Sequence, residues 1–336
     1  MLYNIVNGSD LFLHILYFLF PAMFCYYSIA KYIQFSKTKS YFQPIRQEGP
    51  KSHLKTKQKI PTFGGVFIVL AITLTHLILS DLTNTYILAT LFILVSFAVI
   101  GFVDDYLKVA KKSSSGFKGS IKIIIQFFLI LSVIFILGIN NPKLWSGKID
   151  IPFSDSSINI GFFYFLFAGI VVVGSANATN LTDGLDGLVS VPTIFNSVAL
   201  IAIIFTLSES EIKEFYPLIL FLYTLITAVA MFLLFNKYPA KIFMGDVGSL
   251  SIGATMGIIA IIIKKELAFA IITILFIIEA LSVIIQVAYY KICKKRIFLM
   301  APIDHHFEKI GWSEQKIIKI FWSVSLIASI IGFISV

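Results

Sequence analysis

Long apolar segments alternate with short polar ones along almost the whole chain. Ten of them are rich in Leu, Ile, Val and Phe and about long enough to cross a bilayer as helices, which takes roughly 20 residues. They lie near 11–33, 62–80, 86–104, 121–139, 160–178, 190–207, 216–235, 246–263, 266–290 and 316–335. The pattern predicts an all-α, polytopic integral membrane protein of about ten transmembrane helices, forming a single domain over residues 1–336.

The composition and the positions of the basic residues support this reading and orient the helices. The chain is 58% hydrophobic and only 13% charged, whereas about a quarter of an average soluble domain is charged. Of its 27 Lys and Arg residues, 22 fall on one side of the predicted bundle. Positively charged loops stay in the cytoplasm. We therefore expect both termini on the outer, periplasmic side, and we read the net charge of +9 as a topology signal rather than as a nucleic-acid partner.

The polar segments between the helices carry the candidate chemistry. Five of them fall on the predicted cytoplasmic side, where a single active site would need them to meet. They read KQKIPTFGG at 57–65, GFVDDYLK at 101–108, NATNLTDGLDGL at 177–188, MGDVGSL at 244–250 and MAPIDHHFE at 300–308.

Acidic residues dominate these segments. Asp104 and Asp105 are placed at the end of an apolar helix, where carboxylates oppose the helix dipole, so a solvated helix end explains them less well than a cation or proton-transfer role. Asp183 and Asp186 are predicted to flank a turn, although Asn, Asp and Gly also form ordinary turns. Asp246 has a simpler interpretation as a helix N-cap. Such an oxygen-rich set suits Mg²⁺.

The adjacent His305 and His306 allow several interpretations. A His pair is more often structural than catalytic, and no cysteine or i,i+4 histidine lies nearby to suggest zinc. Binding of an anion such as a pyrophosphate fits the basic surroundings better. Together with the acids and lysines, the pair indicates metal-assisted phosphoryl chemistry on a lipid phosphate.

FVDDYLK, NATNLTDGLDGL, MGDVGSL and APIDHHFEKIGWSE, in this order and spacing between Lys57 and Trp312, resemble the MraY family of phospho-N-acetylmuramoyl-pentapeptide transferases. The resemblance implies ten transmembrane helices in the bacterial cytoplasmic membrane. It also implies a homodimer, with UDP-MurNAc-pentapeptide and undecaprenyl phosphate as substrates. The implied reaction gives lipid I and UMP with Mg²⁺ as cofactor.

The resemblance also implies roles for single residues. It implies Asp246 as the Mg²⁺ ligand and Asp104, Asp105, Asp183, His305 and His306 as catalytic. It implies substrate contacts for Lys57, Lys108, Lys122, Asn180, Gly184, Leu185, Asp186 and Phe243, the last stacking on uracil. Lys59 lies close enough to Lys57 to exchange roles with it.

The chain departs from the family pattern at two positions. Phe63 replaces a methionine, which is a mild change. Asp304 stands where the family has the first of three histidines, and an aspartate would repel phosphate, so that histidine's role is in doubt here.

Several alternatives remain at this stage. A lipid phosphate is mostly dianionic at pH 7, which weakens the case for Asp104 or Asp105 as an obligatory base. Their alternative roles are positioning, Mg²⁺ tuning, or attack as a nucleophile in a two-step reaction through an aspartyl phosphate. A related enzyme using a UDP-sugar without the peptide is the nearest alternative function. A transporter is a different class, but its acids usually lie near the bilayer midplane within inverted repeats, and neither is visible here.

Overall fold

A computed structural model describes residues 8–39, 60–111, 116–141 and 146–336 of the chain. Its elements are α1 (Gly8–Lys39), α3 (Gly64–Leu79), α4 (Thr85–Ala110), α5 (Gly119–Asn140), β1 (Lys148–Asp150), β2 (Ser157–Asn159), α6 (Phe163–Thr182), α7 (Ser190–Ile204), α8 (Glu209–Asn236), α9 (Gly245–Ile262), α10 (Glu266–Ile272), α11 (Ile274–Cys293), α12 (Ile303–Lys309) and α13 (Glu314–Ile334). The prediction of an all-α, polytopic membrane protein is confirmed.

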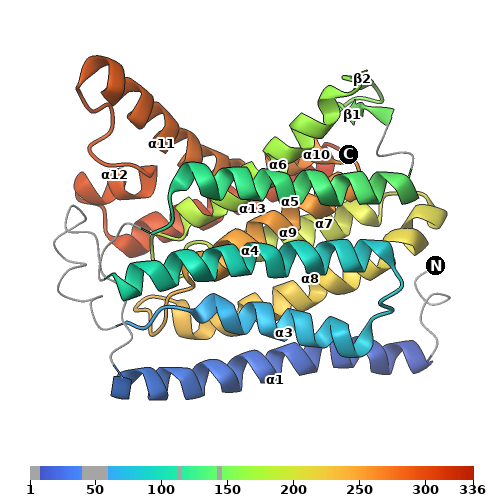
Figure 1. Ribbon diagram of the computed structural model, residues 1–336, viewed down its shortest axis with the longest axis horizontal. Coiled ribbons are helices and arrows are strands. Elements are labelled where there is room, and N and C mark those ends of the chain that lie inside the picture. Colours follow the sequence, from blue (N-terminus) through green and yellow to red (C-terminus); the bar gives the residue numbers. More distant parts are fainter. Residues whose placement is uncertain (1–7, 40–59, 112–115, 142–145) are drawn as a thin grey trace.

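The helices form one elongated bundle, with most of them running along its length (Figure 1). Within the described ranges, eight helices are long and apolar enough to cross a membrane, and α3 and α7 are shorter apolar helices. These ten helices correspond to the ten predicted segments. In Figure 1, α1 begins at the same end of the bundle at which α13 ends, as the predicted topology requires.

The centre of the bundle is α9, which packs against α3, α4 and α6. Every one of its residues is buried, so it is surrounded by protein rather than by lipid. Small side chains allow this close packing, as is common between membrane helices. At Gly253, a β-carbon would lie 2.6 Å from the carbonyl oxygen of Ser175 on α6, and the Ser175 hydroxyl donates to the Gly253 carbonyl over 2.8 Å.

The single helix predicted over 266–290 is divided in the structure. The short α10 ends at Ile272 and α11 begins at Ile274. At the break, the Thr273 hydroxyl donates to the Phe269 carbonyl over 2.8 Å, a type of side-chain bond that bends helices. Beyond it, α11 leaves the bundle at an angle (Figure 1). The apolar pattern continues across Thr273 without a Gly or Pro, which is why the sequence predicted one helix.

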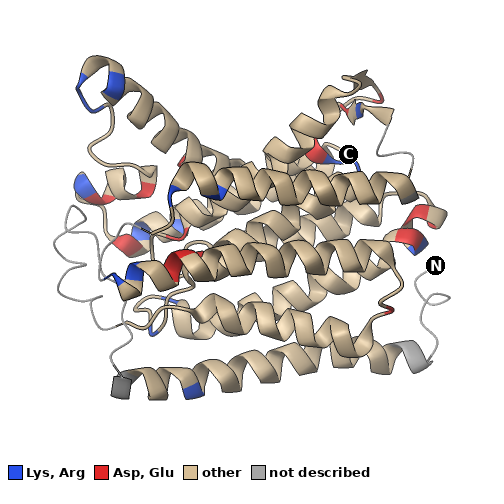
Figure 2. Ribbon diagram, in the orientation of Figure 1, with Lys and Arg blue, Asp and Glu red and all other residues tan. Residues whose placement is uncertain are grey.

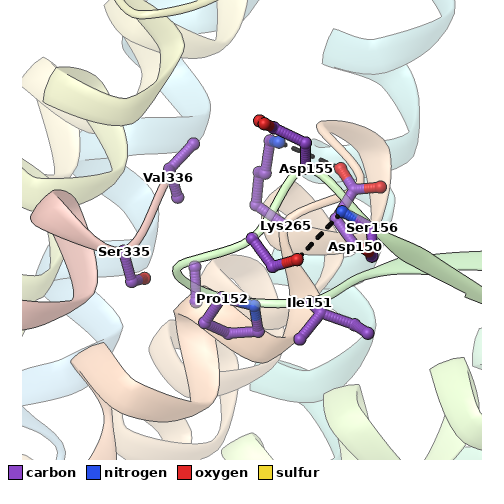
Figure 3. Close-up of a pocket in the computed structure, with 10 residues that line it drawn as sticks. Asp150, Ile151, Pro152, Asp155, Ser156, Lys265, Ser335 and Val336 are labelled. Carbon is purple, nitrogen blue, oxygen red and sulfur yellow. Dashed lines mark hydrogen bonds and ion pairs between the residues drawn. The ribbon is translucent and has the colours of Figure 1, made fainter.

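A small hairpin is the one sheet found in the described residues, and the all-α prediction did not include it. β1 and β2 pair antiparallel, with Ile149 opposite Ile158. The hairpin lies near the end of α9 that is opposite Asp246, where Lys265 forms an ion pair of 3.0 Å with Asp150. A polar pocket of about 180 Å³ lies here, lined by Asp150, Lys265 and Ser335 among others (Figure 3).

Candidate active site

Three carboxylates from two helices meet at one end of the bundle. Asp104 and Asp105 lie on α4 and Asp246 lies in the first turn of α9. One carboxylate oxygen from each residue lies within 4.8 Å of the other two, and all three residues are buried. Because buried carboxylates are stable only with compensating charge, the cluster needs cations around it.

Two lysines provide part of that charge. Lys108 Nζ lies 2.5 Å from Asp104 Oδ2 and 3.1 Å from Asp246 Oδ1. Lys122, near the start of α5, places its Nζ 2.9 Å from Asp246 Oδ2. The two ammonium groups therefore hold both oxygens of the Asp246 carboxylate. Figure 2 shows Lys, Arg, Asp and Glu concentrated toward the ends of the bundle, while its middle is almost free of charged residues.

The acidic pair is held from outside α4 as well. The Phe117 N–H donates to Asp104 Oδ1 over 2.7 Å, and the Val247 N–H approaches Asp105 Oδ2 at 3.4 Å. Asp104 and Asp105 were expected at the end of a helix, but α4 continues to Ala110. The helix dipole argument for them therefore applies less strongly, and they lie inside the last turns of α4.

A close approach of α4 to α9 brings these residues together. A β-carbon on Gly101 would lie 2.3 Å from the Asp246 carbonyl oxygen, so only glycine fits there. Gly245 has a φ of 76°, a conformation that favours glycine, and it lets the chain turn into α9 beside Asp105. Asp246 is the second residue of α9 and does not cap it, since Met244 occupies that position, so the N-cap interpretation is wrong.

The segment at the start of α3 is hydrogen-bonded to the turn that precedes α9. The Phe243 N–H donates to the Pro61 carbonyl over 2.9 Å, and the Gly64 and Gly65 N–H groups donate to the carbonyls of Phe243 and Met244 over the same distance. The backbone of Phe243 is thereby fixed, while its side chain is partly exposed, as a stacking role would need. Lys57 and Lys59 lie outside the described residues.

Asn180 joins the cluster from α6. Its Nδ2 donates to Asp246 Oδ1 and to the Ser249 hydroxyl, both over 2.9 Å. The sequence placed Asn180 in a loop, but α6 continues to Thr182 and Asp183 caps it. Desolvation, together with the nearby Asp246 and Asp105 carboxylates, raises the pKa of Asp183 well above its ordinary value. Asp183 therefore belongs to the same electrostatic cluster.

The loop after Asp183 has mainly structural contacts. The Asp186 carboxylate accepts the Ala240 N–H over 2.9 Å, and its own N–H donates to Glu314 Oε1 over 2.9 Å. Leu185 is buried in a second hydrophobic cluster with Leu275 and Phe321. The expected substrate contacts of Asp186 and Leu185 remain predictions, and the structure adds that both residues fix the loop to its neighbours.

The two histidines have different surroundings on α12. His305 Nδ1 is 2.7 Å from Glu308 Oε2, while a β-carbon on Gly184 would lie 3.3 Å from His305 Nε2. The ring of His305 therefore faces the loop that follows Asp183. His306 Nδ1 accepts the Leu299 N–H over 3.2 Å. His306 is engaged with its own loop, and the sequence alone could not distinguish the two.

Asp304, the departure from the family pattern, is completely buried. A β-carbon on Gly184 would lie 2.7 Å from its Oδ2, so its carboxyl abuts the loop after Asp183. It lies beside a second buried carboxyl, that of Glu279 on α11, whose Oε2 accepts the Ile303 N–H over 2.9 Å. Glu279 was not among the residues predicted from the sequence. Its signal there is an acid within an apolar segment, which is costly and often functional.

The donor set of the cluster fits a hard divalent cation. Carboxylate oxygens are the ligands that Mg²⁺ prefers, together with water and substrate phosphates. Asp104, Asp105 and Asp246 supply three such groups within reach of one another. Lys108 and Lys122 place positive charge beside these carboxylates. A bound cation and substrate phosphates would lie next to the same lysines.

Comparison with known proteins defines the class. Residues 85–264 match the model of glycosyl transferase family 4, a range that runs from the start of α4 past the end of α9. The chain therefore belongs to this family and is a multi-pass protein of the bacterial cytoplasmic membrane.

More similar proteins narrow the assignment. The chain is 47% identical over 306 residues to the phospho-N-acetylmuramoyl-pentapeptide-transferase of Rickettsia prowazekii (strain Madrid E), covering 88% of this chain and 84% of the relative. It is 45% identical over 317 residues to the protein of the same name from Rickettsia bellii (strain OSU 85-389), covering 90% and 87%. The chain belongs to the phospho-N-acetylmuramoyl-pentapeptide-transferase family, as its motifs indicated.

Proposed function

We propose that this chain transfers phospho-MurNAc-pentapeptide from UDP-MurNAc-pentapeptide to undecaprenyl phosphate, giving lipid I and UMP, in the first membrane step of peptidoglycan synthesis. Mg²⁺ is the proposed cofactor, and the whole chain is the proposed transferase domain. The observation that carries the proposal is the meeting of Asp104, Asp105 and Asp246 with Lys108 and Lys122 at one end of an apolar bundle.

The proposed reaction exchanges one phosphate linkage for another. An oxygen of the lipid phosphate forms a bond to the sugar-bearing phosphorus of the UDP-sugar. The bond from that phosphorus to the bridging oxygen breaks, and its electron pair leaves with UMP. Such a reaction needs positioning and positive charge more than covalent help from the protein, which is what two lysines and a cation site offer.

Each part of the site has a proposed task. Lys108 and Lys122 bind the phosphates, and Asn180 orients the Asp246 carboxylate through the bond described above. Asp104, Asp105 and Asp246 would hold Mg²⁺, which when bound neutralises the charge on the phosphates and on the leaving group. The partly exposed Phe243 is available for stacking on the uracil ring, and the apolar bundle keeps the lipid acceptor next to the site.

Purified protein provides the test. UMP release is measured from UDP-MurNAc-pentapeptide with undecaprenyl phosphate and Mg²⁺, for the wild type, Asp246→Asn and the matched control Asp81→Asn. Asp81 is an exposed acid bonded to Thr83, and we expect its variant to be as active as the wild type. Loss of one ligand and charge should lower the rate of Asp246→Asn at least about a hundredfold.

The donor is varied in the same assay. Equal turnover of UDP-GlcNAc would contradict the proposed donor and favour the related enzymes that use a sugar without the peptide. Full activity of Asp246→Asn would contradict the proposed site. Activity that is unaffected by EDTA would contradict the proposed cofactor.

A further inference from the structure

Two polar side chains on α11 hold the segment that carries the histidines. Glu279 and Gln286 are seven residues apart and therefore lie on the same face of the helix. Gln286 Oε1 accepts the N–H groups of Ile297 and Phe298, both over 3.0 Å, and its Nε2 donates to the Phe298 carbonyl over 3.0 Å. The segment between α11 and α12 is thus hydrogen-bonded to α11 at Ile297 and Phe298.

Glu279 continues this attachment at the start of α12. Its Oε2 accepts the Ile303 N–H over 2.9 Å, at the first residue of α12. The first N–H groups of a helix have no partner within the helix, so an external acceptor satisfies them. No lysine or arginine among the described residues forms an ion pair with Glu279, and its side chain is completely buried.

The position of α12 matters because of what its first turn touches. A β-carbon on Gly184 would be 2.7 Å from Asp304 Oδ2 and 3.3 Å from His305 Nε2. There is consequently no spare room between α12 and the loop after Asp183. Phe307 of the same helix packs against the second hydrophobic cluster, which contains Leu185. A displacement of α12 would therefore change the distance from His305 to the acidic cluster.

We propose that Glu279 is a positioning residue of the transferase, which fixes α12 so that His305 faces the site. The proposal rests on the proposed function for its link to catalysis, and on the Ile303 N–H contact for its link to α12. Glu279 does not touch the substrate in this role. The role needs an acceptor oxygen at this position. Gln would supply one through its amide carbonyl, while Ala would remove the acceptor of the Ile303 N–H.

The test compares Glu279→Ala, Glu279→Gln and the control Glu266→Ala in the full-length protein in detergent. Glu266 is a second buried carboxylate, bonded to the Tyr164 hydroxyl near the opposite end of α9. Two quantities are measured. Hydrogen–deuterium exchange of peptides covering 303–309 reports on α12 directly, and UMP release reports on catalysis at a temperature at which all variants are folded.

We expect Glu279→Ala to speed exchange in 303–309 and to lower the rate of UMP release about tenfold or more, as supporting residues of active sites do. Glu279→Gln should restore slow exchange and most of the activity. Glu266→Ala should lose thermal stability but keep wild-type exchange in 303–309 and wild-type kinetics. A residue with only a general stabilising role would instead make the two alanine variants behave alike.

Two results would overturn the proposal. One is unchanged exchange in Glu279→Ala, and the other is faster exchange with unchanged UMP release. A failure of the proposed function is recognised separately, because then the wild type itself releases no UMP while the exchange data still show whether Glu279 holds α12.

Discussion

Lys122 and Asp246 are joined by an ion pair of 2.9 Å, although 124 residues separate them in the sequence. The pair links the start of α5 to the start of α9. It places a fixed positive charge against the carboxylate that is the proposed metal ligand. The charge of the site is therefore shared between lysines and any bound cation, and this arrangement leads to the following predictions.

Binding of a divalent cation should stabilise the protein. We expect Mg²⁺ to raise the melting temperature of the wild type, because a ligand that binds only the folded state contributes about 2.7 kcal/mol at about one hundred times its dissociation constant. Asp246→Ala should show no such shift. The measurement is thermal unfolding in detergent with and without Mg²⁺, with Ca²⁺ as a test of selectivity. An equal shift in Asp246→Ala would mean that the cation binds elsewhere.

The approach of α4 to α9 should tolerate no side chain at residue 101. Because the space is closed by the Asp246 backbone, Gly101→Ala should lower stability by about 1–3 kcal/mol or more and reduce UMP release. The matched control is Gly174→Ala on α6, where a β-carbon would meet nothing within 4 Å. Helix propensity favours Ala there by about 1 kcal/mol. Equal behaviour of the two variants in thermal unfolding and kinetics would refute the packing argument.

The two histidines should differ in their importance. His305 turns its Nε2 toward Gly184, in the loop that follows Asp183, and its Nδ1 contacts Glu308, so we expect His305→Gln to lower the rate of UMP release about tenfold to a hundredfold. His306 bonds the Leu299 N–H, a contact that an Asn carbonyl can replace, so His306→Asn should retain more activity. Steady-state kinetics of both variants decide this, and a larger loss in His306→Asn would reverse the assignment.

UMP release should require the lipid acceptor. Both carboxylates of the acidic pair are already engaged by backbone N–H groups and Lys108, which favours a positioning role over covalent attack. We therefore expect no UMP from a stoichiometric mixture of enzyme and UDP-MurNAc-pentapeptide without undecaprenyl phosphate. Rapid-quench measurements check this. A burst of UMP matching the enzyme concentration would support a two-step reaction through an aspartyl phosphate.

Much of the architecture could be predicted from the sequence, because each membrane helix corresponds to a continuous run of apolar residues. The ten apolar segments all correspond to helices, and the motifs that carry Asp104, Asn180 and Asp246 meet as expected. The break at Thr273 escaped prediction, since no Gly or Pro marks it and it accompanies the tertiary packing of α10 against α13. The extension of α6 through Asn180 was also missed, because Asn and Asp are read as turn formers.

Parts of the site depend on contacts that no local pattern reveals. The Phe117 N–H that holds Asp104 comes from a loop between helices, and Glu314 reaches Asp186 across 128 residues. The different surroundings of His305 and His306 depend on the orientation of each ring, toward Glu308 and Gly184 for His305 and toward the Leu299 N–H for His306. These relationships are set by tertiary packing, whereas spacing and residue type only restrict which groups can take part.

The complete burial of α9 has a consequence for how the protein is assembled. A helix that contacts only other helices gains little from lipid, and the Gly, Ser and Thr residues of α9 make it less apolar than the neighbouring α4. Its neighbours α3, α4 and α6 all precede it in the chain. During synthesis, α9 therefore enters the membrane after α3, α4 and α6, so Asp246 reaches the cluster after Asp104, Asp105 and Asn180.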